Sequence, residues 1–146
     1  MNKKILIIPD IHGRTFWRTA LETGNYEKVI FLGDYVDPYV YEGIDPLQAL
    51  SNFKDILSLK IIHQDRVVLL LGNHDLSYYS DHFRNIVGSD RYDYKNEEEL
   101  QHLFRGWRRF FKLAHEETIG SKHYLFTHAG VTMSWLKQNI DVIVKP

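Results

Sequence analysis

The chain has 146 residues, and this length suits one domain; we expect a single domain over residues 1–146. The formal net charge of −1 gives no electrostatic reason to expect a dedicated nucleic-acid binder. The absence of cysteine excludes disulfide scaffolds, thiolate nucleophiles and cysteine-based metal sites. No apolar run is long enough to span a membrane, so we expect a cytoplasmic protein without a membrane partner.

Four short apolar runs predict β-strands, at residues 5–8, 29–32, 67–71 and 124–126. Helices are expected between them, one over residues 15–22 and another that begins after Asp45, with Pro46 at its first position. The second helix would bury the apolar stripe formed by Leu47, Leu50, Phe53 and Leu57. The alternation of strands and helices predicts an α/β fold with a largely parallel sheet.

The periodicity breaks down at residues 77–96, and we expect a loop-rich insertion there with one helical turn. A helix is predicted over residues 97–113, opened by a capping box of Asn96 and Glu99. Its aromatic stripe indicates a face packed on the core with solvated arginines between, although a partner-binding or nucleic-acid-binding face is the alternative. The tyrosines of the insertion are expected to pack locally, the alternative being that they stack on a nucleotide base.

Residues that can bind a metal ion or transfer a proton follow each predicted strand directly. In chain order they are Asp10 and His12, Asp34 and Asp37, Asn73 and His74, and His128. Each of them alone is weak evidence, because a single aspartate after a strand is more often a helix cap than a ligand. The carboxyl ends of parallel strands meet at one edge of a sheet, where ligands bind, so four such motifs predict a common site.

Carboxylates, imidazoles and a side-chain amide suit divalent manganese, iron or zinc. Asp34 can bridge two ions, which would stabilise the attacking and leaving oxygens of a phosphoryl displacement. A water held between the ions ionises more easily and becomes the nucleophile. His74 is then free to act as general acid, and Asp37 can orient it.

The motifs Asp10-x-His12, Gly33-Asp34-x-x-Asp37, Gly72-Asn73-His74-Asp75 and His128-Ala129-Gly130 closely resemble those of the calcineurin-like metallophosphoesterases. Gly-Asp-Tyr-Val-Asp and His-Ala-Gly-Val are most similar to the branch that contains phosphoprotein phosphatases and dinucleoside-polyphosphate hydrolases, and the resemblance covers residues 5 to about 131. It implies one metal ion on Asp10, His12 and Asp34 and a second on Asp34, Asn73 and His128. It also implies His74 as the acid, paired with Asp37, and two divalent ions as cofactors, for which we favour manganese.

The chain departs from the family pattern at two arginines that would grip phosphate. Pro38 stands where an arginine normally follows the second aspartate of Gly-Asp-x-x-Asp, and Leu71 stands before Gly-Asn-His. Since arginine is the planar reader of phosphate, substitutes are expected elsewhere. Arg14, next to the first motif, is the candidate for substrate binding, and the insertion offers the further candidates Arg84 and Arg91.

The family also closes its second metal site with a histidine well beyond His128, and strands that complete its second sheet would follow residue 146. We therefore expect the N-terminal part of the family fold, with an incomplete second sheet and an apolar surface that favours oligomerisation. The predicted function is metal-dependent hydrolysis of a phosphomonoester, carried by a protein or by a small molecule. A hydrolase of nucleotide polyphosphates and a non-catalytic metal-binding or interaction module are the alternatives.

Overall fold

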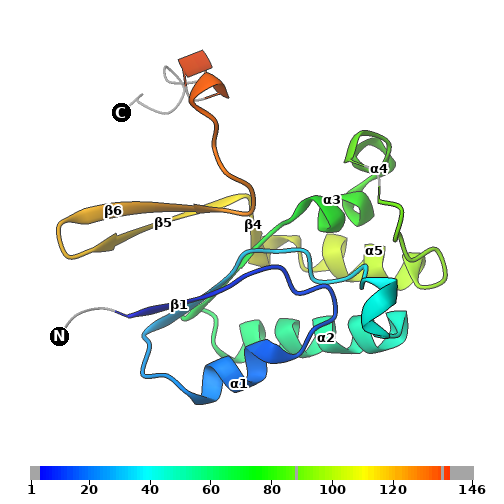
Figure 1. Cartoon of the computed structure of the whole chain (residues 1–146), viewed down its shortest axis with the longest axis horizontal. Helices are drawn as coiled ribbons and strands as arrows, with labels where there is room; N and C mark the ends of the chain where they lie inside the picture. Colours follow the sequence, from blue (N-terminus) through cyan, green and yellow to red (C-terminus); the bar gives the residue numbers. More distant parts are fainter. Residues whose placement is uncertain (1–3, 88, 136, 139–146) are drawn as a thin grey trace.

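The computed structural model of the chain describes residues 4–87, 89–135 and 137–138 (Figure 1). Its strands are β1 (Ile5–Ile8), β2 (Lys28–Phe31), β3 (Val67–Leu70), β4 (Phe111–Lys112), β5 (Ala114–Ile119) and β6 (Lys122–Thr127). Its α-helices are α1 (Phe16–Glu22), α2 (Pro46–Ile62), α3 (Asn73–Tyr79), α4 (Asp81–Val87) and α5 (Glu97–Gly106). Two short 3₁₀-helices complete the elements, η1 (Val40–Glu42) and η2 (Arg108–Phe110).

The first four strands form one parallel sheet in the order β1-β2-β3-β4. Ile8 lies opposite Phe31, and Phe31 lies opposite Leu69, so the strands end at the same edge. The predicted α/β class and the first three strands are confirmed, each strand within one residue of its predicted bounds. Asp45 caps α2 as predicted: its carboxylate accepts the backbone N–H of Leu47, and the Gln48 side chain accepts the N–H of Asp45.

The prediction for the fourth strand of the parallel sheet was wrong. Residues 124–126 do form a strand, β6, but it pairs antiparallel with β5 in a separate two-stranded sheet. The fourth parallel strand is β4, which lies within the segment predicted to be the end of the helix over residues 97–113. That helix ends at Gly106, a residue with low helix propensity, and Phe111 is buried in the sheet beside Leu69. Burial of this aromatic ring outweighs the continued helical pattern.

The insertion was also predicted with too little helix. Residues 73–87 form α3 and α4, and the irregular part is confined to residues 89–96. The capping box at Asn96 is not formed, because the Asn96 amide donates to the Asp93 carboxylate, 2.6 Å away, and makes no cap hydrogen bond. Tyr78 and Tyr92 pack locally, as predicted: their rings stack with centroids 4.4 Å apart, and both are buried, whereas Tyr94 is 72% exposed.

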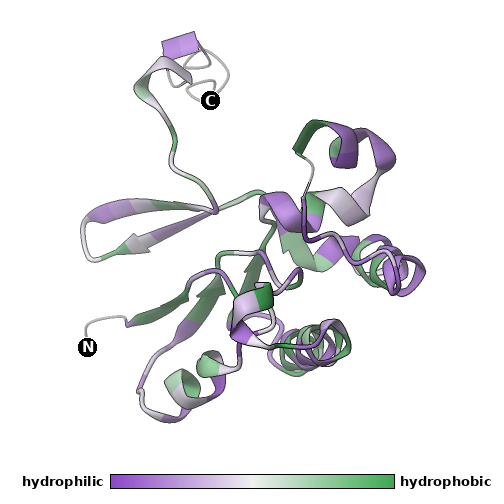
Figure 2. Cartoon of the chain, turned by 45° about the vertical axis from the view of Figure 1, so that its right-hand side comes forward, coloured by the Kyte–Doolittle hydropathy of each residue, from purple (hydrophilic) through white to green (hydrophobic). Residues whose placement is uncertain are grey.

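The two faces of the parallel sheet are covered differently (Figure 2). Val29, Phe31 and Leu69 point into a large core that includes residues of α1, α2 and α5. Ile30 and Val68, which alternate with them along the strands, belong to a small cluster on the other face. The β5–β6 hairpin lies on that second side, opposite α1 and α2 (Figure 1). None of the helices among the described residues is long and apolar enough to cross a membrane.

Candidate metal centre

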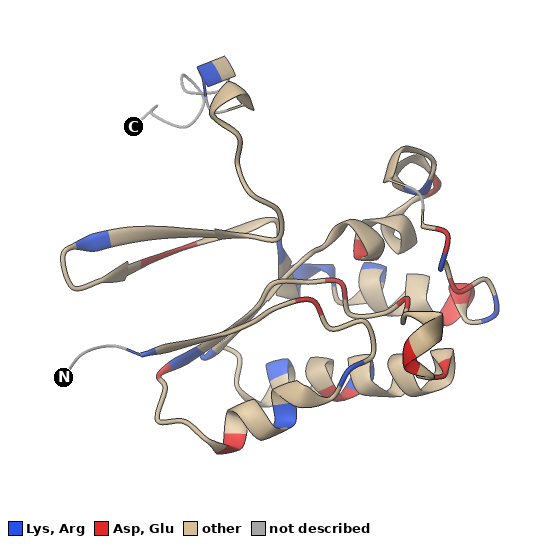
Figure 3. Ribbon diagram, in the orientation of Figure 1, with Lys and Arg blue, Asp and Glu red and all other residues tan. Residues whose placement is uncertain are grey.

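The loops that leave the carboxyl ends of the strands bring the predicted site residues together, and acidic segments lie along them (Figure 3). Two overlapping groups have ligand atoms within 4.8 Å of one another, and Asp34 is common to both. The first group is His12, Asp34 and His74, and the second is Asp10, Asp34 and His128. A single carboxylate is therefore at the centre of the arrangement, as the bridging role predicted for Asp34 requires.

Three site residues have left-handed backbone conformations that non-glycine residues seldom adopt. The φ angles are 44° at His12, 53° at Asp34 and 59° at Asp37. Such conformations cost about 1–3 kcal/mol each and persist only where surrounding contacts impose them. Here the carbonyl of Asp34 accepts the backbone N–H of His12 at 2.7 Å, which ties the β1 loop to the β2 loop. The strained backbone conformations therefore coincide with three of the predicted site residues.

Gly33 and Gly72 allow the β2 and β3 loops to approach each other closely. A Cβ atom on Gly72 would lie 2.0 Å from Oδ1 of Asp34, and one on Gly33 would lie 2.4 Å from the nitrogen of Gly72. Asp75 fastens the same two loops, since its buried carboxylate accepts N–H groups of Asp34, Tyr35 and Gly72 at 2.7–3.0 Å. Burial raises the pKa of Asp75, and these three donors oppose that rise.

The oxygens of Asp34 face different partners. Oδ1 accepts the backbone N–H of His74 at the start of α3, at 3.0 Å. Oδ2 lies 3.5 Å from Nε2 of His12 and 3.5 Å from Nε2 of His128. The carboxylate is buried, and His12 is buried beside it. One oxygen therefore fixes the orientation of the side chain while the other faces two imidazoles.

Both of those imidazoles are oriented as metal ligands usually are. Nδ1 of His12 lies 2.9 Å from the carbonyl of Val36, and Nδ1 of His128 lies 3.0 Å from the carbonyl of Leu32. A carbonyl only accepts, so each Nδ1 carries the proton and each neutral ring offers the lone pair of Nε2. Burial lowers the pKa of His12, which favours this neutral form.

Asn73 adds a neutral oxygen to the second group. Its Oδ1 lies 3.1 Å from Nε2 of His128, and with Nδ1 protonated both of these atoms are acceptors. Two acceptors at this distance gain nothing from each other, whereas a cation shared between them would satisfy both. The donor set of nitrogen and oxygen atoms therefore fits divalent ions such as manganese, iron or zinc.

The position of Asp10 differs from the expected grouping. Its Oδ1 lies 3.7 Å from Nδ1 of His128, and it falls in the second group, whereas the resemblance puts it on one ion with His12 and Asp34. His74 occupies the remaining place in the first group, yet both of its ring nitrogens have partners. Asp10 and Asn73 are the exposed residues among the predicted ligands.

His74 and Asp37 form the predicted pair. Nδ1 of His74 lies 2.8 Å from Oδ2 of Asp37, whose carboxylate is fully buried. The hydroxyl of Tyr78 donates to Oδ1 of the same carboxylate. Nε2 of His74 lies 3.1 Å from Nη2 of Arg91 and accepts from it, because guanidinium nitrogens only donate. The imidazole is therefore held from both sides in a single orientation.

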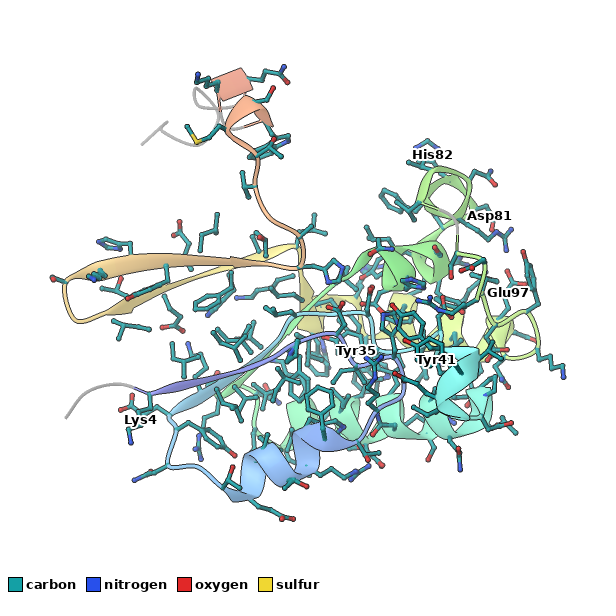
Figure 4. The ribbon with its side chains drawn as sticks, viewed as in Figure 1. Lys4, Tyr35, Tyr41, Asp81, His82 and Glu97 are labelled. Carbon is teal, nitrogen blue, oxygen red and sulfur yellow. The ribbon has the colours of Figure 1, made fainter. Side chains whose placement is uncertain are left out.

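The three candidate arginines have different partners in the structure. Arg14 forms a two-pronged ion pair with Glu42, with Nη2 2.6 Å from Oε1, so its fork is occupied. Arg84 pairs with Asp81 and Glu97, and Figure 4 shows both of these partners at the periphery, on α4 and at the start of α5. Arg91 alone of the three contacts the predicted acid: besides Nε2 of His74, it reaches the carbonyl of Asp37 and lies over the ring of Tyr39.

Sequence reasoning did not identify which residues orient the side chains of the site. Tyr78 follows the Gly-Asn-His-Asp motif and had no feature that marked it, since it stood in an aperiodic segment. Asp75 was part of the motif, but the sequence could not show that its carboxylate accepts three backbone N–H groups. Arg91 was one of three candidates, and only the path of residues 89–96 distinguishes it.

The chain matches one family model and several known proteins. The model of the calcineurin-like phosphoesterases matches residues 3–144. A probable serine/threonine-protein phosphatase of Encephalitozoon cuniculi is 39% identical over 77 residues, which are 51% of this chain and 15% of that protein. A solved structure of a protein serine/threonine phosphatase from Saccharomyces cerevisiae, with similarity to human phosphatase PP5, matches with a TM-score of 0.50 and 25% identity. The match covers 77% of this chain and 34% of that one, so the chain spans only a minor part of either relative.

Proposed function

Because the chain belongs to the calcineurin-like phosphoesterase family, we propose that it hydrolyses phosphomonoesters, on a phosphoprotein or on a small molecule. The proposed ligands of two divalent ions are Asp10, His12, Asp34, Asn73 and His128. The observation that carries this proposal is the shared position of Asp34, whose Oδ2 lies 3.5 Å from the Nε2 atoms of both His12 and His128. Both relatives named above are described as serine/threonine phosphatases, which supports a phosphoprotein as the substrate.

When bound, the two ions supply the positive charge that polarises the phosphoryl group and makes an attacking water more acidic. The chain's own residues do the rest. His12 and His128 keep Nε2 free of protons, since their Nδ1 atoms donate to backbone carbonyls. Asp34 is fixed by the N–H of His74 and therefore needs little reorganisation when the ions bind.

His74 is the proposed general acid, through Nε2. Asp37 accepts the Nδ1 proton at 2.8 Å, which fixes the tautomer and stabilises the charged imidazolium. In the structure Nε2 accepts from Arg91 and so carries no proton. When a phosphoester displaces this contact, Nε2 takes up a proton from solvent, and the resulting imidazolium donates it to the leaving oxygen.

Arg91 is the proposed phosphoryl-contacting arginine, in place of the family arginines absent at Pro38 and Leu71. It stacks over Tyr39 with its guanidinium carbon 3.7 Å from the ring centroid, and its Nε donates to the carbonyl of Asp37. A planar fork held in this way beside His74 can turn toward a phosphate with little loss of side-chain entropy. Arg14, whose fork lies on Glu42, remains the weaker candidate.

We further propose a single domain over residues 1–146, since this length suits one domain, with manganese as the favoured metal and the cytoplasm as the compartment. A nucleotide polyphosphate is the less favoured substrate, because the rings of Tyr78 and Tyr92 stack on each other and these faces are not open to a nucleotide base.

Separate substitutions of the ligands and of the acid test the proposed function. His128→Ala and Asn73→Ala should each remove one of two ions, because they delete donors of the second group only. His74→Ala should leave both ions bound and slow the hydrolysis of an alkyl phosphate, whose leaving oxygen needs a proton, by about 10²- to 10⁴-fold, the usual contribution of a general acid. Metal content by elemental analysis and initial rates give the two readouts.

His82→Ala is the matched control, since His82 is an exposed histidine of α4 that points away from the site (Figure 4). It should change neither readout. Loss of metal in His74→Ala would show that this residue is a ligand and not the acid. One ion per wild-type chain without turnover would instead identify a non-catalytic metal-binding module.

A further inference from the structure

Asp37 is held by two side chains and not by His74 alone. Its Oδ2 accepts from Nδ1 of His74 at 2.8 Å, and its Oδ1 accepts the hydroxyl proton of Tyr78. Tyr78 and Asp37 are both fully buried, so no water competes for these bonds at either end. The order His74–Asp37–Tyr78 therefore forms a continuous chain from the proposed acid into the core.

The direction of the hydrogen bond from Tyr78 is fixed by its surroundings. The backbone N–H of Asp93 donates to the phenol oxygen at 2.8 Å, so that oxygen is already an acceptor there and its proton is free for Asp37. Burial and the neighbouring carboxylate of Asp37 both raise the pKa of Tyr78, so the hydroxyl keeps its proton. Tyr78 is thus a permanent donor to Asp37.

The ring of Tyr78 is as tightly held as its hydroxyl. It stacks between Tyr92, with centroids 4.4 Å apart, and Phe104, with centroids 5.9 Å apart. Asp37, in contrast, has a left-handed backbone with φ of 59°, a conformation that needs an external restraint. A rigid donor on one oxygen supplies that restraint and prevents the carboxylate from rotating away from His74.

We propose that Tyr78 is a positioning residue for the acid step, which acts on His74 through Asp37. The inference rests on the function proposed above and extends the acid pair to a triad. Without the Tyr78 hydroxyl, Oδ1 of Asp37 is a buried acceptor with no partner, so the carboxylate turns toward other donors and His74 loses its fixed orientation. Proton delivery to the leaving oxygen then becomes less efficient.

Tyr78→Phe tests the proposal, because it deletes one oxygen and retains the stacked ring. An orientation defect in the acid matters most where the leaving oxygen needs a proton. The variant should therefore lower kcat about tenfold for an alkyl phosphate and less than threefold for p-nitrophenyl phosphate, with KM unchanged for both. A purely structural role would lower both rates by the same factor. Equal losses for the two substrates, or no loss, would overturn the proposal.

Tyr92→Phe is the matched control. Its ring stacks on Tyr78, but its hydroxyl contacts Glu97 and lies outside the triad. It should leave the ratio of the two rates at the wild-type value. A change in the ratio equal to that of Tyr78→Phe would show that packing of the tyrosine pair, and not the hydroxyl on Asp37, controls the acid.

A second readout needs no turnover. The Nδ1 proton of His74, assigned by its loss in His74→Ala, should give a slowly exchanging low-field NMR signal in the wild type loaded with diamagnetic Zn²⁺, and this signal should broaden or vanish in Tyr78→Phe. An unchanged signal would overturn the positioning role. If the wild type hydrolyses neither substrate, the proposed function fails, while this signal still decides whether Tyr78 fixes the pair.

Discussion

The two faces of the parallel sheet differ in how completely they are covered. Beneath the helices lies a continuous core of aromatic and aliphatic side chains, in which Phe53 contacts Tyr35, Phe104 and Phe111. The hairpin face has a small cluster of three buried residues, and Leu125 on β6 is 56% exposed. Most of the hydrophobic stabilisation must come from the helix side, since it scales with the apolar area removed from water.

The residues of the candidate metal centre are likewise supported from two sides that differ in how well they are packed. His12, Asp34 and Asp37 lie on loops bound to one another and to α3, which packs on α5. His128 follows β6 and so comes to the site from the hairpin side, where it contacts the carbonyl of Leu32. The first candidate group is therefore supported by the larger core, and the second depends on the less covered face.

The largest expected effect is on the helix side. Phe53→Ala should lower the free energy of unfolding by about 3–5 kcal/mol, because it empties a fully buried aromatic site. Urea denaturation of the metal-free chain measures this value. A loss below about 1 kcal/mol would mean that the helix-covered core does not dominate stability, and the comparison between the two faces would fail.

An intermediate effect, on substrate binding, is expected at Arg91. This residue lies in the irregular segment 89–96 and contacts His74 from there. Arg91→Met should raise the KM for p-nitrophenyl phosphate about tenfold, since a charge-assisted phosphate contact is lost. Arg14→Met is the matched comparison and should stay within about twofold, because Glu42 already occupies that guanidinium. The reverse ranking in steady-state kinetics would assign phosphate binding to Arg14.

The smallest effect is expected on the hairpin side. Phe126 is only partly buried, where it packs on Ile30, Val68 and Leu70, so Phe126→Ala should cost about 1 kcal/mol. Since His128 lies two residues further on, the second ion should bind about fivefold more weakly and the first ion unchanged. Isothermal titration with Mn²⁺ resolves the two ions. Equal weakening of both would show that the hairpin supports the whole centre.

The parts of the fold that sequence predicted are those decided by local chemistry. The apolar runs at β2 and β3 are buried on both faces, whereas β1 is an edge strand on which Ile7 is 46% exposed. Asp45, followed by Pro46, begins α2 through its own side chain. The parts that sequence missed depend on distant partners. Phe111 enters the sheet because Leu69 lies beside it, and Asn96 turns to Asp93 instead of capping α5.

The same division holds within the site. The proposed ligands could be named from the motifs, because each motif follows a strand end and parallel strands end at one edge. Their supports could not be named, because the donors to Asp37 and Asp75 are defined by chain segments that meet only in the folded protein. Tyr78 and Arg91 both belong to the segment where the sequence shows no period.

The most direct measurement is the number of Mn²⁺ ions that each chain binds, in the wild type and in Asp34→Ala. Because Oδ2 of Asp34 faces both His12 and His128, the wild type should bind two ions, and the substitution should weaken both together. A wild-type chain that binds two ions, with an Asp34→Ala variant that loses only one or neither, would contradict a centre built on a shared carboxylate.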